Sequence, residues 1–243
     1  TNTVAVYGVG VLLGVYFTNF GNVINGLILP KAVKTIYNKA SPKILTREMV
    51  RISRVSLILL IYIYGAFLLF GQDFIYLWVG ESYEASWFVA ILIMTAYILP
   101  ISQGYAHAIL EAKKMMRFKA LIFLVFSVTG ITMGGVLSKS FGVDGMIYGL
   151  FICLIVLQVV LTIFYHKRAG VDMWVYLKEA LGPFLILLLF VVICSYWILQ
   201  LFSVSWGQFV LKGISYSLIF VCGLLFVLTK EERKIILSKY ISF

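Results

Sequence analysis

The sequence predicts an all-α, polytopic membrane protein. Apolar residues make up 62% of its 243 residues and charged residues only 12%, against roughly 45–50% and about 25% in an average globular chain. The apolar residues gather in long runs, and most of the net charge of +10 lies between these runs. A soluble protein needs more charge to cover its surface, and a disordered chain is polar and poor in aromatic residues. Both of these classes are therefore excluded.

Seven apolar runs are each close to the roughly 20 residues that cross about 30 Å of hydrocarbon as a helix. The runs are Val4–Leu29, Val55–Phe70, Ser86–Leu110, Ala120–Leu137, Met146–Tyr165, Ala180–Leu201 and Phe209–Thr229. None has the period of two of a membrane β-barrel, so each is expected to be a helix. The short polar loop around Ser138–Asp144 predicts that the fourth and fifth runs form an antiparallel hairpin. Residues 1–170 are expected to form one set of transmembrane helices, and residues 171–243 two more helices and a cytoplasmic tail.

The charged residues predict how the chain is oriented in the membrane. All but two of the 20 lysine and arginine residues lie in four segments. These segments all lie on one side of the membrane if each of the seven runs crosses it. These segments are Lys31–Arg54, Glu111–Lys119, His166–Glu179 and the tail after Thr229. Since basic loops stay in the cytoplasm, the chain is expected to begin outside and end inside. The charge thus indicates topology and not a nucleic-acid-binding surface.

No enzyme, metal or cofactor motif is found in the sequence. It has no glycine-rich phosphate loop and no nucleophile elbow. The cysteines lie within predicted helices without C-x-x-C spacing and are expected to be buried apolar residues; they are Cys153, Cys194 and Cys222. Thr1 is not an initiator methionine, and no basic segment precedes the first helix. We therefore expect the sequence to be the C-terminal portion of a longer chain.

Uncharged polar residues are the candidates for a transport site, because no carboxylate falls in the middle of a predicted helix. One broad face of the first helix carries Thr18, Asn19, Asn22 and Asn25. These side chains are expected either to line a wet cavity and contact sugar hydroxyls or phosphate oxygens, or to form hydrogen bonds between helices. Both interpretations are open at this stage.

A second polar face lies in the third run, where Gln103, His107 and Glu111 follow one another at four-residue spacing. Pro100 precedes them and is expected to kink the helix. The three side chains would form a polar lining or a protonatable relay. Alternatively, His107 and Glu111 simply lie in the cytoplasmic headgroup layer.

Two further patterns concern packing and the membrane surface. Three pairs of glycines at GxxxG spacing predict close contact between helices; they are Gly10/Gly14, Gly130/Gly134 and Gly145/Gly149. One face of a short basic segment carries Val33, Ile36 and Tyr37. This face predicts either an interfacial helix on anionic lipid or a solvated helix in a loop.

Four stretches resemble polysaccharide flippases. Phe70–Ser86, FGQDFIYLWVGESYEAS, is similar to the helix end and outer loop where an LWLG-x-x-Y/F-x-x-A pattern recurs. Gly104–Ala120, GYAHAILEAKKMMRFKA, is similar to the next helix end, with L-x-A before a basic turn. Phe141–Ile152, FGVDGMIYGLFI, resembles the G-x-x-G-A-A-x-A start of a following helix, and Val6–Pro30 closes in Ile-Leu-Pro before a basic loop. Together they resemble, over about residues 4–170, the O-antigen and polysaccharide flippase (Wzx-type) branch of the multidrug/oligosaccharidyl-lipid/polysaccharide exporter superfamily.

The resemblance implies fourteen helices in two lobes, of which this chain supplies the last seven and a missing N-terminal half the others. It implies that an undecaprenyl-pyrophosphate-linked oligosaccharide crosses the bacterial inner membrane by alternating access, for O-antigen and lipopolysaccharide assembly, without a cofactor. Family members hold the pyrophosphate with cationic cavity residues, but the first helix here has no lysine or arginine in its interior. Asn19, Asn22 and Asn25 are therefore the candidates for sugar or phosphate contacts.

Three other functions are compatible with a chain of this hydropathy. A multidrug or other exporter of the same superfamily is the nearest alternative, because the sequence of this portion does not distinguish the substrate classes of the superfamily. A seven-helix receptor would carry Asp-Arg-Tyr after the third helix and Asn-Pro-x-x-Tyr in the seventh, and neither is present. A membrane-embedded glycosyltransferase or polymerase would need a sizeable polar loop, whereas the outer segment Gly71–Ala85 is short and lacks lysine and arginine. The protein is therefore not expected to be an enzyme.

Overall fold

The computed structural model describes the chain except for residues 1, 27, 39, 200–202, 230–231 and 234–243. The described residues are almost all helical and contain no β-strand, which confirms the all-α class. The elements are α1 (Asn2–Gly26), α2 (Ile28–Tyr37), α3 (Pro42–Val79), η1 (Glu81–Tyr83), α4 (Ser86–Ser102), α5 (Gly104–Ala112), α6 (Met116–Phe164), η2 (Tyr165–Ala169), α7 (Met173–Tyr176), η3 (Leu177–Leu181), α8 (Gly182–Leu199) and α9 (Trp206–Val227). Within the described part, 6 helical segments are long and apolar enough to cross a membrane. The chain thus has the character of a multi-pass membrane protein.

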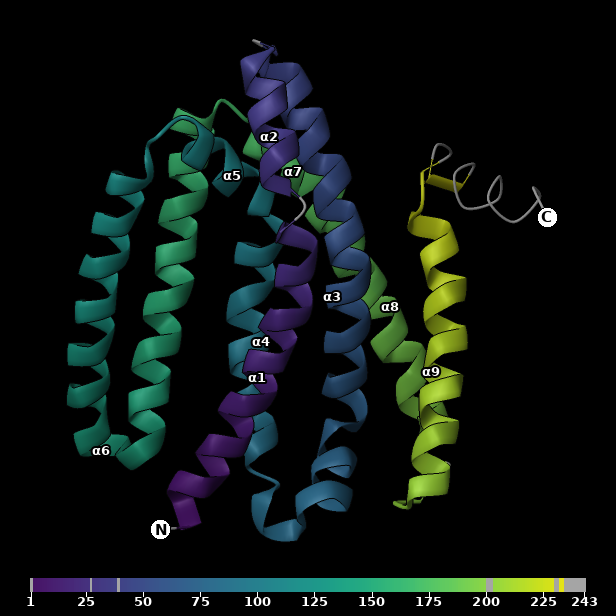
Figure 1. Cartoon of the computed structure of the whole chain (residues 1–243). Helices are drawn as coiled ribbons and strands as arrows, with labels where there is room; N and C mark the ends of the chain where they lie inside the picture. Colours follow the sequence, from purple (N-terminus) through teal and green to yellow (C-terminus); the bar gives the residue numbers. More distant parts are fainter. Residues whose placement is uncertain (1, 27, 39, 200–202, 230–231, 234–243) are drawn as a thin grey trace.

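Helix α6 contains both the fourth and the fifth predicted run and turns back on itself at Gly142. Gly142 has a φ of 61°, a left-handed conformation that favours glycine. The two arms that it separates lie side by side (Figure 1). The predicted antiparallel hairpin is therefore confirmed, and one of the six long segments accounts for two of the predicted runs.

Glycines bring these helices into close contact. A Cβ atom added to Gly149 would lie 2.4 Å from the backbone nitrogen of Gly134, across the α6 hairpin. On α1, a Cβ atom added to Gly10 would lie 2.7 Å from the Cβ of Val89 in α4. Neither position has room for a side chain. The GxxxG spacing is thus used for helix packing, as predicted.

Helix α3 is the central element of the fold. It packs against α4, α8 and α9, and Leu57, Leu60 and Ile61 on it are fully buried. Its 38 residues span about 57 Å at 1.5 Å per residue, nearly twice the hydrocarbon thickness. The predicted run Val55–Phe70 is therefore only the middle of a longer helix.

Helix α3 kinks at Phe70 and then continues to Val79. Near the kink, the indole nitrogen of Trp87 donates a hydrogen bond of 2.9 Å to the carbonyl oxygen of Phe67. A kink frees backbone groups from their helical partners, and Trp87 satisfies one of them from α4. The segment beyond the kink stays helical because most of its residues are still apolar.

The third predicted run is two helices in the structure. Helix α4 ends at Ser102 and α5 begins at Gly104, with Gln103 between them at φ −91° and ψ 14°. Pro100 lies inside the last turn of α4, where its ring removes one helical hydrogen bond. The expected kink is thus a helix break that falls at Gln103 and not at the proline.

The charged residues lie at two opposite ends of the molecule. One end, called the basic end below, holds α2, the start of α3, α5 and α7 (Figure 1). The other, called the acidic end, holds η1 and the turn of α6, with Glu81, Glu84 and Asp144. The segregation of charge expected from the sequence is therefore present in three dimensions.

Helix α2 does not present one apolar face to its surroundings. Ile28 and Ala32 are buried where α2 packs on α5, and Ile36 also packs against the core. Val33 and Tyr37 are exposed. The face predicted from Val33, Ile36 and Tyr37 is thus divided between the core and the outside, because α2 docks on a neighbouring helix.

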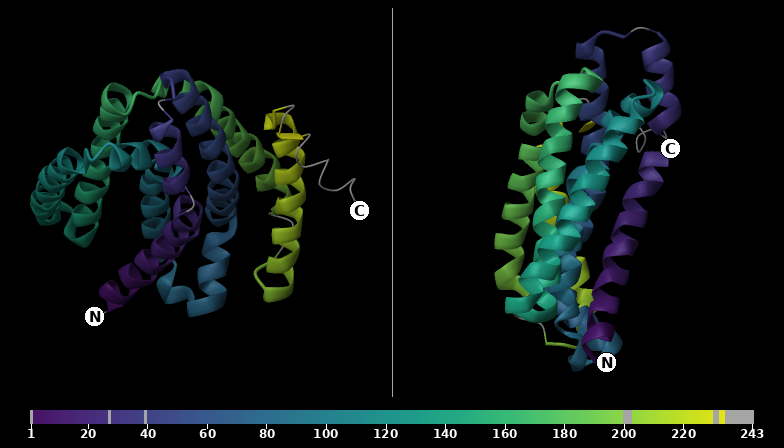
Figure 2. Two further views of the ribbon diagram at one scale, coloured as in Figure 1. Left: turned by 45° about the horizontal axis from the view of Figure 1, so that its top comes forward. Right: turned by 90° about the vertical axis from the view of Figure 1, so that its left-hand side faces the viewer.

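Helices α8 and α9 follow Gly170, a left-handed residue with φ 78°. They lie on the opposite side of α3 and α4 from the α6 hairpin (Figure 2).

The cysteine prediction is correct for Cys153, which is buried, and wrong for Cys222, which is exposed. Cys222 lies beside the exposed residues Val221 and Leu225. It therefore belongs to an apolar outer face of α9.

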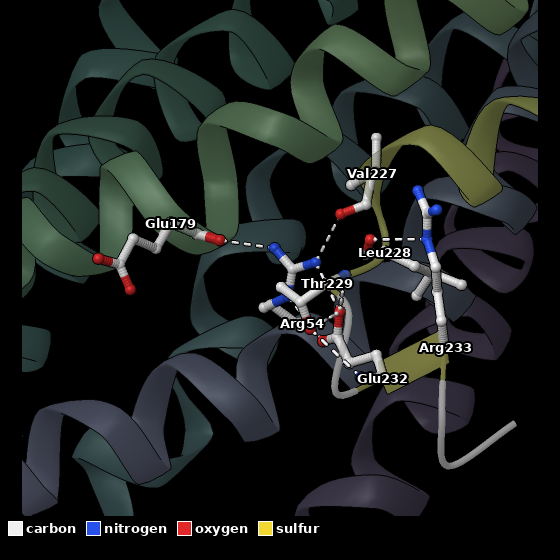
Figure 3. Close-up of polar contacts among 7 residues, drawn as sticks. All are labelled: Arg54, Glu179, Val227, Leu228, Thr229, Glu232 and Arg233. Carbon is white, nitrogen blue, oxygen red and sulfur yellow. Dashed lines mark hydrogen bonds and ion pairs between the residues drawn. The ribbon is translucent and has the colours of Figure 1, made fainter. Parts of the chain in front are cut away.

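Arg54 joins α3 to both C-terminal helices near the basic end. Its buried guanidinium donates hydrogen bonds to the carbonyl oxygens of Glu179, at 2.7 Å, and Val227, at 2.8 Å (Figure 3). Nε and Nη2 donate to the two carboxylate oxygens of Glu232 at 2.7 and 2.8 Å. The guanidinium also lies 5.4 Å from the ring centroid of Phe184. The charge is thus fully compensated by acceptors from three segments.

Glu232 is itself held by Thr229, whose backbone nitrogen and hydroxyl donate to one carboxylate oxygen at 2.8 and 2.9 Å. Burial alone raises the pKa of the Glu232 carboxyl, but the hydrogen bonds from Arg54 and Thr229 outweigh burial and lower the pKa below 4.5. At the acidic end, buried Lys212 of α9 donates to Asp73 of α3. Charged groups therefore bond α9 and the segment after it to α3 near both ends of the helix.

Candidate functional site

A cavity of about 790 Å³ lies between α1, α4, α5 and both arms of α6. This volume is in the range of small-molecule sites. Most of its walls are apolar; examples from α1, α4 and the second arm of α6 are Val11, Ile93, Tyr97, Leu150 and Phe151. The cavity is thus an open groove lined by helices that the sequence predicts to lie in the membrane.

Polar residues line the part of this cavity that is nearest the basic end. They come from the last turns of α1, from α5 and from the two outer ends of the α6 hairpin; they are Asn22, His107, Glu111, Lys119 and Gln158. Towards the acidic end the lining consists mainly of apolar residues of α1 and α6, such as Val4, Val143 and Met146. The cavity therefore has a charged, hydrogen-bonding end and an apolar remainder.

The structure brings together three of the six predicted site residues. Asn22, His107 and Glu111 line the cavity, whereas Asn19 is exposed elsewhere on α1. Thr18 and Asn22, four residues apart, share the cavity face, while Asn19 follows Thr18 by about 100° around the helix. The side chain of Asn25 lies outside the described residues. Gln103 is buried directly behind the cavity wall.

His107 and Lys119 form the central contact of the polar end. Lys119 Nζ lies 2.7 Å from His107 Nδ1. An ammonium group has no lone pair, so Lys119 donates and Nδ1 of a neutral imidazole accepts. The carboxylate of Glu111, one helical turn further along α5, lines the same cavity. Among the described residues, the polar end thus presents a cation, an anion and neutral donors.

Gln103 connects α5 to the second arm of α6. Its Oε1 accepts a hydrogen bond of 2.9 Å from Nε2 of Gln158, and its Nε2 donates to the hydroxyl of Thr162 at 3.1 Å. Both glutamines are almost fully buried. The polar face predicted in the third run therefore holds both arms of α6, through Gln103 on one arm and His107 on the other.

The acidic end of the cavity is bounded by a second contact between α1 and α6. The hydroxyl of Tyr7 donates to Oδ1 of Asp144, next to the turn of the hairpin. Tyr7 lines the main cavity and also a smaller pocket on the far side of this contact. The Tyr7–Asp144 hydrogen bond therefore lies at the junction of the two spaces.

Sequence reasoning missed Lys119, Gln158 and Tyr7 as site residues. Lys119 was counted with a basic loop, and Gln158 is one amide inside an apolar run. The unusual cost of an amide within a membrane helix was the signal available for Gln158.

No known protein family, no curated protein and no solved structure matches this chain.

Proposed function

We propose that the chain is the C-terminal portion of a flippase that moves a lipid-linked oligosaccharide across the bacterial inner membrane for O-antigen or other surface polysaccharide synthesis. The observation that supports this function is the cavity, which is polar near the basic end and apolar elsewhere. A lipid-linked sugar has the same division, with a charged head and an apolar chain. The identity of the lipid carrier, undecaprenyl pyrophosphate, is inferred from the sequence resemblance.

The proposed topology has seven crossings, because each arm of the α6 hairpin is long enough to cross alone. With the basic end in the cytoplasm, the chain begins outside and its last helix ends inside. Its partners are then membrane lipids, the lipid-linked oligosaccharide and the N-terminal half of the same transporter. The cavity would open beside α1, the helix nearest to that half in sequence.

The mechanism follows from the cost of moving charge through lipid. A phosphate head cannot enter hydrocarbon without several kcal/mol of desolvation, so it crosses along polar groups while its lipid chain stays in the apolar phase. Lys119, His107 and Asn22 are the groups of this chain that would contact the head from the cytoplasmic side. Rocking of the two lobes would then expose the head to the outer side.

The test compares two amides of α1 that differ in position. Asn22 lines the cavity and Asn19 does not. We expect Asn22→Leu to reduce surface polysaccharide in cells at normal protein levels, and Asn19→Leu to leave it unchanged. The measurement is the polysaccharide profile of a deletion strain that carries each full-length variant. Unchanged polysaccharide with Asn22→Leu would contradict the proposed role of the cavity.

A multidrug or other exporter of the same superfamily is the second candidate, because most of the cavity wall is apolar. Such an exporter would bind apolar cations near Glu111. The deletion strain would then become sensitive to lipophilic cations and keep its polysaccharide. The two functions are thus separated in one strain by two measurements.

A further inference from the structure

A second pocket, of about 520 Å³, lies at the acidic end. It is formed by the first turns of α1, the start of α4 with the η1 turn before it, and the start of the second arm of α6. Its polar and aromatic lining comes from all of these segments; the residues are Thr3, Tyr7, Ser82, Phe88, Asp144 and Tyr148. This lining differs from that of the main cavity in both charge and chemistry.

The pocket combines a carboxylate, hydroxyl groups and aromatic rings. Asp144 accepts a hydrogen bond from the hydroxyl of Tyr7, which leaves its second oxygen and further lone pairs for a ligand. The ring of Tyr148 packs edge-on against Phe88, with centroids 6.3 Å apart, and against Phe141 at 6.4 Å. The aromatic side chains are therefore held in place by one another.

This lining selects against phosphate. Among the described residues that line the pocket none is basic, and Asp144 repels an anion. A sugar ring suits the same groups, because its hydroxyls donate to a carboxylate and accept from phenol or serine hydroxyls, while its C–H face packs on aromatic rings. The chemistry thus points to a neutral carbohydrate.

The pocket and the main cavity share part of their lining. Tyr7, Val89 and Ile147 contribute to both spaces. A ligand that extends through the cavity would therefore meet the pocket at the end opposite to Lys119. Under the proposed topology this end is the outer side, where the glycan is released.

We propose that the pocket between Tyr7, Asp144 and Tyr148 is a glycan subsite that binds neutral sugar residues at the acidic end of the transport path. This inference rests on the proposed function for its biological role. The binding itself is a property of the purified chain and is measured without transport.

The experiment is saturation-transfer NMR on the purified full-length protein in neutral-lipid nanodiscs. The probes are free glucose, galactose, rhamnose and N-acetylglucosamine, each at millimolar concentration. We expect saturation transfer to at least one sugar, and binding about tenfold weaker in Asp144→Asn, the loss of one hydrogen bond to a charged group. Glu81→Gln removes a carboxylate at the same end but outside the pocket lining. It should bind like the unmodified protein.

Asp144→Asn keeps the size of the side chain and an oxygen that accepts from Tyr7, so it is expected to fold, and its thermal unfolding checks this. Tyr148→Leu is the second variant and should also weaken binding by removing the ring. Three results would each overturn the glycan subsite. They are saturation transfer to none of the sugars, equal binding in Asp144→Asn and Glu81→Gln, and competition by inorganic phosphate. The flippase proposal fails separately, through unchanged polysaccharide in Asn22→Leu cells.

Discussion

The α6 hairpin and the α8–α9 pair are both apolar and lie on opposite sides of α3 and α4 (Figure 2), yet they are bonded to the fold in different ways. α9 and the segment that follows it are joined to α3 by charged groups near both ends of the helix, through Arg54 and through Lys212. The α6 hairpin is bonded by a pair of neutral amides, Gln103 and Gln158, and at the cavity edge by two hydrogen bonds with one charged partner each, Lys119–His107 and Tyr7–Asp144.

Under the proposed function, this difference predicts one fixed and one movable wall. Breaking the Arg54 contacts would leave buried charge without a partner, which is costly in a low-dielectric interior. Opening the α6 hairpin would break the neutral Gln103–Gln158 hydrogen bond, which is worth much less inside a membrane. It would also break the Lys119–His107 and Tyr7–Asp144 hydrogen bonds, in each of which only one partner is charged. Since the cavity lies beside α6 and not beside α9, the proposed function predicts that the hairpin is the part that changes position.

The largest effect is expected from Arg54→Met. The substitution removes the charged donor of two backbone carbonyls and of Glu232, which keeps only its hydrogen bonds from Thr229. It should lower the free energy of unfolding by roughly 3 kcal/mol. Arg51→Met, at an exposed position of the same helix, should change it by at most about 0.5 kcal/mol. Thermal unfolding in detergent measures both, and equal effects would show that the Arg54 contacts do not anchor the C-terminal segment.

A somewhat smaller loss is expected when the α6 arms are forced apart. The added methyl group of Gly149→Ala would lie 2.4 Å from the backbone nitrogen of Gly134, and should destabilise the chain by about 2 kcal/mol. Gly135→Ala is the matched control, since a Cβ there has nothing within 4 Å, and should be neutral or stabilising. A cysteine cross-link between the arms that forms equally well in Gly149→Ala would argue against this packing.

The pH dependence of stability should come in part from Glu232. The pKa of this carboxyl is lowered below 4.5 in the folded chain, so its stabilising effect is present above pH 4.5 and is lost as the pH falls through the folded pKa. The temperature at which the unmodified protein unfolds should therefore fall as the pH is lowered through this acid range. Glu232→Gln should show a smaller decline, and identical profiles would mean that the carboxylate does not contribute to stability.

The helices, the hairpin and the separation of charge could be predicted because hydropathy and charge are local properties of the sequence. The turn at Gly142 needs only a polar loop and a glycine between two apolar runs. The break at Gln103 was misplaced because the proline is visible in the sequence, whereas the contacts of Gln103 with α6 are not. The run Val55–Phe70 is shorter than α3 because hydropathy marks only its most apolar part, whereas the pairing of Asp73 with Lys212 places a charged residue inside the helix.

The contacts that define the candidate site could not be predicted, because they join residues far apart in the chain. Arg54 and Glu232 are separated by 178 positions, and Gln103 and Gln158 by 55. Helical spacing shows which residues of one helix share a face, and so it identified His107 and Glu111. It does not show which helix lies opposite, and so Lys119 and Gln158 were missed.

The smallest effect concerns the Gln103–Gln158 hydrogen bond, and it measures how firmly the hairpin is held. A double-mutant cycle with Gln103→Leu and Gln158→Leu should give a coupling free energy of about 0.6 kcal/mol, the average for hydrogen bonds between membrane helices. Each single variant leaves a buried amide unpaired, so the cycle is needed to isolate the pair. A coupling as large as the effect of Arg54→Met would mean that α6 is anchored as firmly as α9. A small coupling would mean that this amide pair adds little to the cost of opening the hairpin, as the proposed movement beside the cavity requires.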